Sequence, residues 1–186
     1  MGALANILKP VVAAAFVSLF GGVTPGSAQD RLAELMIELQ SAEPAAAEKL
    51  VDEIQLEWSK SGSAAADLLL SRGRKAFDAG NLDAAIEHYS ALTDHAPTFA
   101  EGWVERARAY LEVGLYGPAL ADLETALSLN PQHFEAINGL GVILETIDKP
   151  VEAYEAYSLV RSIHPHHPAV TDALERLEPV VKGRKL

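Results

Sequence analysis

A period of 34 residues in the middle of the chain constrains its fold more than any other feature. Gly73, Ala107 and Gly141 stand 34 positions apart, and three further columns keep the same step. Those columns are Ala85, Ala119 and Ala153; Pro97, Pro131 and Pro165; and the large residues Tyr89, Leu123 and Tyr157. Self-similarity at a fixed period of this length is typical of repeat architectures. The sequence therefore predicts three copies of one structural unit between residues 66 and 167.

Each copy is predicted to form two helices joined by a tight turn. In the second copy, apolar residues recur at helical spacing over residues 103–111 and again over residues 119–127. Gly114 separates the two stripes, and Pro131 stops the second one because a proline restricts the residue before it. The column of Gly or Ala has a steric cause, since two antiparallel helices approach closely only where side chains are small. The facing Tyr or Leu then fills the space that remains.

Helical segments flank the repeats on both sides. Residues 29–65 contain two apolar stripes, at 32–39 and 50–58, which do not keep the period. We expect this N-terminal helical pair to stack against the first repeat as a lid. Residues 168–186 predict a C-terminal capping helix, limited by Pro179, and a basic tail, because a solenoid needs a cap over its last apolar face.

The first 28 residues have the pattern of a secretory signal peptide. Lys9 precedes an apolar run from Val11 to Phe20, and the small residues Gly26 and Ala28 fit a cleavage site after Ala28. The run is shorter than the ~20 apolar residues that span a bilayer. We therefore expect export, to the periplasm in a cell with an outer membrane, and no stable membrane insertion after cleavage. An uncleaved anchor or a hydrophobic tail are the alternatives.

Composition narrows the partners and the chemistry. The net charge of −11 repels nucleic acid phosphates and anionic lipid, so neither is an expected partner. The chain has no cysteine, which excludes disulfides, thiolate metal sites and a Cys nucleophile. Neither G-x-S-x-G nor H-E-x-x-H occurs, and Gly139–Leu144 lacks the third Gly of a dinucleotide loop. We expect no enzyme and no cofactor. A hydrolase using scattered acids is a rival hypothesis, which requires a deep pocket and carboxylates of raised pKa.

The segment HPHHP, residues 164–168, holds half of the six histidines. In an extended segment His164 and His166 point the same way and could chelate a soft divalent ion, whereas His167 points away. Pro165, however, already belongs to the repeat's own proline column. We predict no metal ligands, and keep a periplasmic metal-binding or metal-delivery protein as the alternative function.

The period and the residue types at its recurring positions resemble the tetratricopeptide repeat (TPR) family, whose pattern is W-x2-L-G-x2-Y…A-x3-F…P. The second copy matches it with Trp103, Ala107, Tyr110, Ala119, Leu123 and Pro131, and departs from it with Arg106 at the Leu position. The third copy replaces the Gly-containing turn with Asp148-Lys149-Pro150. The resemblance implies an all-α, right-handed α-solenoid of three helix-turn-helix repeats (66–99, 100–133 and 134–167) with flanking helices.

The resemblance also implies a protein–protein interaction module, acting as a scaffold, adaptor or assembly factor, that binds another protein or peptide in its concave groove. Carried over position by position, the groove residues are Asp67, Leu70, Arg74, Phe77, Glu101, Val104, Arg108, Leu111, Asn138 and Val142. Arg74 and Arg108 could fork onto a ligand carboxylate or pair internally with Glu101 or Glu135; both readings stay open. The partner and the oligomeric state are not readable from the sequence.

One subclass of ligand is disfavoured. Repeats that hold the acidic tails of cytosolic heat-shock chaperones use a two-carboxylate clamp of Lys, Asn and Arg. The corresponding positions here are Leu70, Arg74, Glu105, Glu135 and Gly139. Because only Arg74 could serve and two of the five are acidic, the clamp is not expected.

Overall fold

The computed structural model describes residues 28–183, and all secondary structure within that range is α-helical. The helices are α2 (Ala28–Ser41), α3 (Pro44–Trp58), α4 (Ala64–Asp78), α5 (Leu82–His95), α6 (Ala100–Glu112), α7 (Tyr116–Leu129), α8 (Phe134–Thr146), α9 (Pro150–Ile163) and α10 (Pro168–Gly183). The predicted signal peptide lies outside the described residues except for its last residue. None of the helices in residues 28–183 is both long and apolar enough to cross a membrane.

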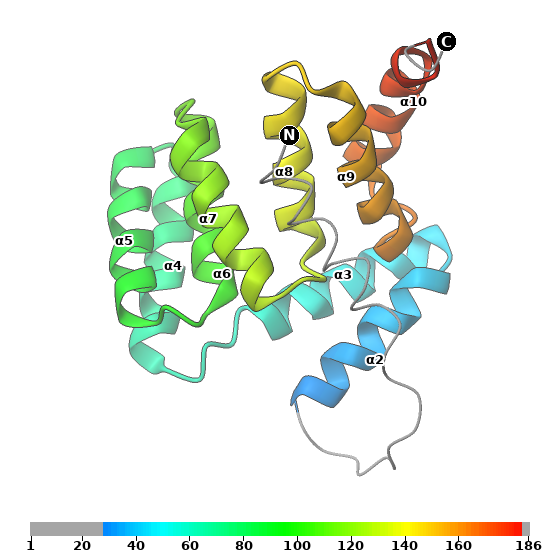
Figure 1. The fold of residues 1–186 in the computed structure, drawn as a ribbon. Coiled ribbons are helices and arrows are strands. Elements are labelled where there is room, and N and C mark those ends of the chain that lie inside the picture. The colour runs from blue at the N-terminus through cyan, green and yellow to red at the C-terminus, as the bar shows by residue number, and fades with distance from the viewer. Residues whose placement is uncertain (1–27, 184–186) are drawn as a thin grey trace.

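Three helical hairpins form the centre of the molecule (Figure 1). α4 packs against α5, α6 against α7 and α8 against α9, and each hairpin packs against the next. The three-repeat α-solenoid that the resemblance implies is thereby confirmed. α10 packs on α9 as a cap, but the expectation that Pro179 limits this helix was wrong. The helix continues to Gly183, because Val181 adds a buried contact beyond the proline and a proline removes only one helical hydrogen bond.

The small-residue column works as predicted. A Cβ atom on Gly73 would overlap the ring of Tyr89, and one on Gly141 would approach Cε1 of Tyr157 to 2.5 Å. Both tyrosines are buried. Each of these pairs lets the two helices of one hairpin pack closely, because the tyrosine ring occupies the space that a side chain on the glycine would take.

The turns inside the hairpins need a left-handed residue at one fixed position. Gly80 and Gly114 have φ angles of 73° and 76°, and Asp148 takes the same position in the third repeat with a φ of 56°. Glycine adopts this region without a Cβ clash, and aspartate is among the few other residues that tolerate it. Pro150 then begins α9, where its fixed φ suits the first turn.

Arg106, the departure from the TPR pattern, is accommodated by a partner on the next helix. Its guanidinium donates to both carboxylate oxygens of Asp122, at 2.7 and 2.8 Å, and to Thr93 Oγ1 at 2.8 Å. Asp122 is buried. This fork-to-fork pair ties α5, α6 and α7 together where the family pattern has an apolar side chain.

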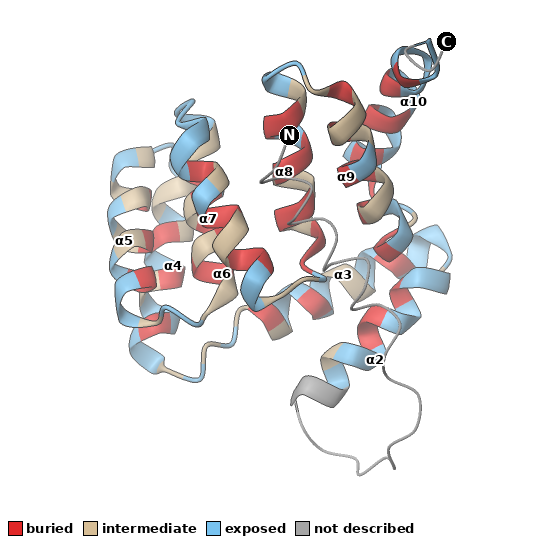
Figure 2. Ribbon diagram, viewed as in Figure 1, coloured by how far each residue is buried: buried red, intermediate tan, exposed pale blue. Residues whose placement is uncertain are grey.

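The N-terminal pair does not stack on the first repeat, so that expectation was wrong. Leu35, Leu39 and Ile54 belong to the hydrophobic cluster of the second and third repeats. The first repeat forms a separate cluster around Leu70 and Tyr89. Figure 2 shows buried residues of α2 and α3 alternating with exposed ones along both helices. Instead, α2 packs against α9, and Trp58 of α3 contacts the rings of His133 and Phe134 at the start of α8.

Candidate functional site

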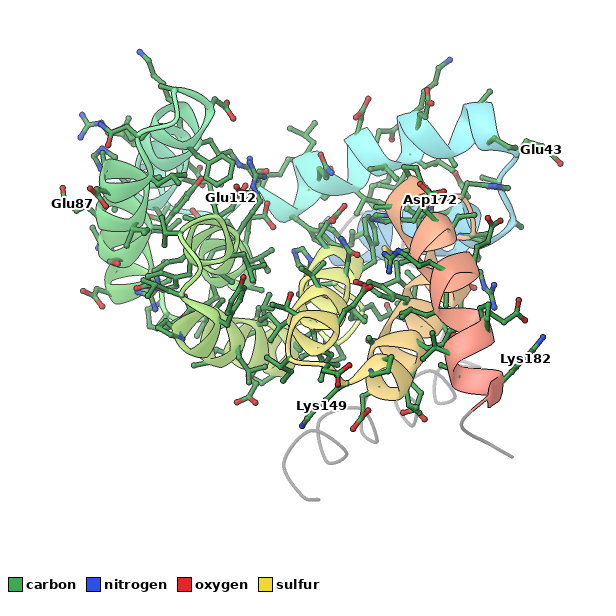
Figure 3. All side chains as sticks on the ribbon, turned by 90° about the horizontal axis from the view of Figure 1, so that it is seen from above. Glu43, Glu87, Glu112, Lys149, Asp172 and Lys182 are labelled. Carbon is green, nitrogen blue, oxygen red and sulfur yellow. The ribbon has the colours of Figure 1, made fainter. Side chains whose placement is uncertain are left out.

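The concave face of the solenoid is built from α4, α6 and α8, and α3 crosses it. Figure 3 looks along the repeat helices, which form an arc, and shows α3 running across the opening between α4 and α10. α3 starts beside the α9–α10 junction, where Pro44 and Ala47 line a hollow together with His164 and His167. α3 ends at Trp58, near the N-terminal ends of α6 and α8. The chain therefore divides its own groove into a covered half and an open half.

Charged residues of the covered half pair with one another. Arg74 donates from Nε to Glu105 Oε1 at 2.5 Å and from Nη1 to Ser59 Oγ at 2.8 Å, and its Nη2 pairs with Glu101. Burial alone would lower the pKa of Arg74, but the Glu105 and Glu101 carboxylates raise it above its ordinary value. Of the two alternatives for Arg74, a ligand carboxylate or an internal ion pair, the structure therefore shows the internal ion pair, with Glu101 as one of the partners.

Arg108 is the more available cation. Its guanidinium stacks 4.0 Å from the centre of the Phe77 ring, and its side chain is 49% exposed. Nη1 lies 3.4 Å from Glu105 Oε2, but the two are too poorly aligned for a hydrogen bond, and that oxygen is buried without one. Glu135, the other internal partner considered, instead lies 3.7 Å from His167 Nε2.

An aromatic contact fastens the end of α3 to α8. The Trp58 indole stacks on His133 with ring centroids 3.9 Å apart, and a tilted contact to Phe134 has centroids 4.9 Å apart. His133 Nδ1 accepts the Ala136 N–H at 3.3 Å, so a neutral ring carries its proton on Nε2, which lies 2.9 Å from Glu101 Oε2. His133 thus caps α8 and connects α3 to the Arg74 network.

The open half of the groove is a cleft of about 410 Å³ between α6 and α8. Five of the predicted groove residues line it: Val104, Arg108, Leu111, Asn138 and Val142. Gly139 lies on its floor, where a Cβ would approach Leu123 to 3.2 Å. Val142 and Tyr116 are 40% and 39% exposed. This half combines an apolar floor with one exposed cation, Arg108, and two carboxylates, Glu112 and Glu135.

The other predicted groove residues serve the fold. Asp67 accepts hydrogen bonds from Ser61 N and Oγ, at 3.0 and 2.5 Å, and these bonds hold its pKa below the ordinary range. Leu70 is buried in the core of the first repeat, Glu101 is buried in the charged network, and Phe77 supports Arg108.

The histidine segment does not have the geometry expected of a chelate. The expectation that His164 and His166 point the same way was wrong, because His167 N donates to His164 O at 3.2 Å and closes a turn. His164 faces His167, with ring centroids 5.3 Å apart, whereas His166 Nε2 lies 3.0 Å from Ala42 O. Among residues 31–183 no group of three or more His, Cys, Asp or Glu could hold a metal ion.

The pKa values of three carboxylates are lowered, which is the direction opposite to the one that the hydrolase hypothesis needs. Burial tends to raise the pKa of Glu135, but His167, with smaller contributions from His133 and His164, holds it below its ordinary value. The pKa values of Asp67 and Glu178 are lowered too. A general acid at neutral pH requires the opposite direction.

Sequence reasoning missed two residues of the site, Trp58 and His133. His133 stands one period, 34 residues, before His167, and His167 Nδ1 likewise accepts the Val170 N–H at 3.4 Å. Extending the repeat alignment to histidines would have identified His133 as a cap. For Trp58, the apolar stripe predicted burial, but no sequence signal named the surface that buries it.

Comparisons with known proteins agree with this geometry. A family model described as tetratricopeptide repeat matches residues 104–168. A TPR repeat-containing protein of Rhizobium etli is 28% identical over 160 residues, which cover 86% of this chain and 78% of that protein. Small glutamine-rich tetratricopeptide repeat-containing protein 2 of Saccharomyces cerevisiae is 33% identical over 113 residues, 61% of this chain but only 32% of that protein.

Solved structures with the same arrangement include peptide-bound ones. The first TPR of Spaghetti (RPAP3) bound to HSP90 peptide SRMEEVD matches with a TM-score of 0.60 and 26% identity, over 63% of this chain and 95% of that chain. The crystal structure of MamA matches with a TM-score of 0.59 and 24% identity, over 63% and 68% of the two chains. The second likeness concerns the fold alone.

Proposed function

The chain belongs to the tetratricopeptide repeat family, and we propose that it is a non-enzymatic scaffold, adaptor or assembly factor that holds a segment of another protein in its concave face. The observation that carries this proposal is the open cleft between α6 and α8, with its apolar floor and exposed Val142. Contiguous exposed apolar surface on a stable fold commonly marks an interaction site. The peptide held by the first TPR of Spaghetti supports the same mode of binding.

The cleft favours an amphipathic segment over an acidic tail. Leu111, Tyr116 and Val142 offer apolar contact, and Arg108 offers one charged hydrogen-bond donor. Arg74 is already paired with Glu101 and Glu105, so a second cation for a tail carboxylate is missing from this part of the groove. The proposed ligand therefore buries apolar side chains and places at most one carboxylate near Arg108.

Affinity capture with matched variants tests the proposal. Val142 in the cleft and Val180 on α10 have similar exposed fractions, 40% and 44%. We expect a partner captured from an extract of the producing cells by the wild-type chain and by Val180→Glu, and recovered at least tenfold less by Val142→Glu. A partner that binds all three chains equally, and also binds Arg108→Glu, would contradict the groove assignment.

We further propose that the protein acts outside the cytoplasm after removal of residues 1–28. The apolar run Val11–Phe20 and the small residues before Gln29 support this location. Mass spectrometry of the protein from a periplasmic fraction is expected to show Gln29 as the first residue. An intact Met1 terminus in that protein would contradict cleavage.

A further inference from the structure

α3 occupies the covered half of the concave face in the way that a bound helix would. Its buried stripe consists of Ala47, Ile54 and Trp58. Just beyond its end, Ser59 accepts a hydrogen bond from Arg74 Nη1 at 2.8 Å. Figure 3 shows the helix spanning the opening of the arc. A helix of the chain itself therefore lies where the groove would receive a partner.

The fit between α3 and the repeats is incomplete. Trp58 Nε1 and Glu105 Oε2 are buried without a hydrogen-bond partner among the described side chains, residues 31–183. About 570 Å³ of space remains beside α3, lined among others by Leu56, Val104 and Arg108. A buried donor without an acceptor costs free energy. A helix that gives its aromatic N–H an acceptor, or fills this space, would bind the same surface better than α3 does.

The connections of α3 permit its departure while the repeats stay in place. Ser59–Ser63 links it to α4, and within this link Gly62 has a φ of 78° with no atom within 4 Å of an added Cβ. Residues 42–43 link it to α2. α2 packs more extensively on α3 than on α9, and Arg31 of α2 pairs with Glu53 of α3, so α2 moves together with α3.

We propose that the surface beneath α3 is a second part of the docking site. Its ligand is a partner's amphipathic helix that ends in an aromatic residue, and this helix displaces α3. This inference rests on the proposed function and names the class of partner. The aromatic residue takes the position of Trp58 on His133, and a hydroxyl or carbonyl beyond it accepts from Arg74. Displacement of α3 joins the covered and open halves into one groove.

The ligand chemistry can be tested with the chain's own helix as a probe. A fluorescein-labelled peptide of residues 43–60 is titrated into the whole chain and followed by anisotropy. We expect at least tenfold tighter binding to Trp58→Ala than to wild type, because the wild-type α3 competes from within the same molecule. The same peptide carrying Trp58→Ala is expected to lose that gain. Ile37→Ala, an exposed change on α2, is the matched control and should bind as wild type does.

A second variant covers the case in which Trp58→Ala fails to fold. Ser59→Ala removes only the hydroxyl that accepts from Arg74 and is expected to tighten peptide binding about threefold. Equal binding to wild type, Trp58→Ala and Ser59→Ala, all with native helical circular dichroism, would overturn the inference. A dimer of the wild-type chain in light scattering would also overturn the inference, since the ligand would then be α3 of a second copy. If either result occurs while Val142→Glu still abolishes partner capture, the proposed function stands without this inference.

Discussion

The indole of Trp58 lies on the imidazole of His133 with ring planes only 19° apart. His133 in turn contacts Glu101, which also pairs with Arg74. One stacking contact therefore connects the N-terminal helical pair (α2 and α3, the N-terminal arm) to the charged network of the groove on α4, α6 and α8. The arm and the groove are coupled through these four side chains.

Removing the stacking ring should loosen the arm measurably. Trp58→Ala is expected to lower the free energy of unfolding by about 3 kcal/mol, the usual cost of deleting a large buried aromatic side chain. Leu56→Ala, two residues away and 61% exposed, should stay within about 0.5 kcal/mol of wild type. Urea denaturation of the three chains measures both effects. Equal losses for the two variants would show that Trp58 contributes no special contact.

The surroundings of two glycines predict different effects of a Gly→Ala change. Gly141→Ala should destabilise the protein by about 2 kcal/mol, because its Cβ enters the ring of Tyr157. Gly117, in the first turn of α7, has no atom within 4 Å of an added Cβ apart from its chain neighbours, so Gly117→Ala should stay within about 0.5 kcal/mol of wild type. Thermal unfolding of both variants checks the difference in size.

The turn of the third repeat predicts a stabilising change. Asp148 has a φ of 56° where the first two repeats have glycine. Asp148→Gly is expected to raise the free energy of unfolding by about 0.5–1 kcal/mol, because it removes the steric strain of a non-glycine residue in the left-handed region. Gly114→Ala places a Cβ on a left-handed residue at the equivalent position and should lower the free energy of unfolding. Denaturation curves in which both variants shift in the same direction would contradict this account of the turn.

How much the sequence predicts differs between these features. The hairpins, the Gly73–Tyr89 packing and the ends of the last repeat follow from the period, because each repeat buries the same face against its neighbour. The location of α3 does not follow, since the stripe through Ile54 and Trp58 specifies an apolar face but not the surface that covers it. The histidine turn was mispredicted because side-chain alternation holds only for an extended backbone.

Acid should destabilise the junction of α9 and α10. Burial and, secondarily, His167 lower the pKa of His164 to about 4, with Glu135 and His166 as the other titratable neighbours. Between pH 6.5, the ordinary pKa of histidine in the unfolded chain, and pH 4, His164 is protonated in the unfolded chain but not in the folded one. The free energy of unfolding therefore falls as the pH drops through this range, and it levels off below pH 4. This contribution amounts to at most about 3 kcal/mol.

The variant that checks this pH dependence is His164→Asn, which introduces the residue found at the equivalent position of the second repeat, Asn130. Its free energy of unfolding should fall less than that of the wild type between pH 6.5 and pH 4. Parallel pH profiles for the two chains would show that His164 is not the group responsible.

The central claim is that a partner binds the concave face and displaces α3. Hydrogen–deuterium exchange of the whole chain, with and without the captured partner, tests it most directly. We predict slower exchange at Leu111 and Val142, which line the open cleft, and faster exchange along α3 (Pro44–Trp58). Slower exchange on α5, α7 and α9, with α3 and the cleft unchanged, would contradict the claim.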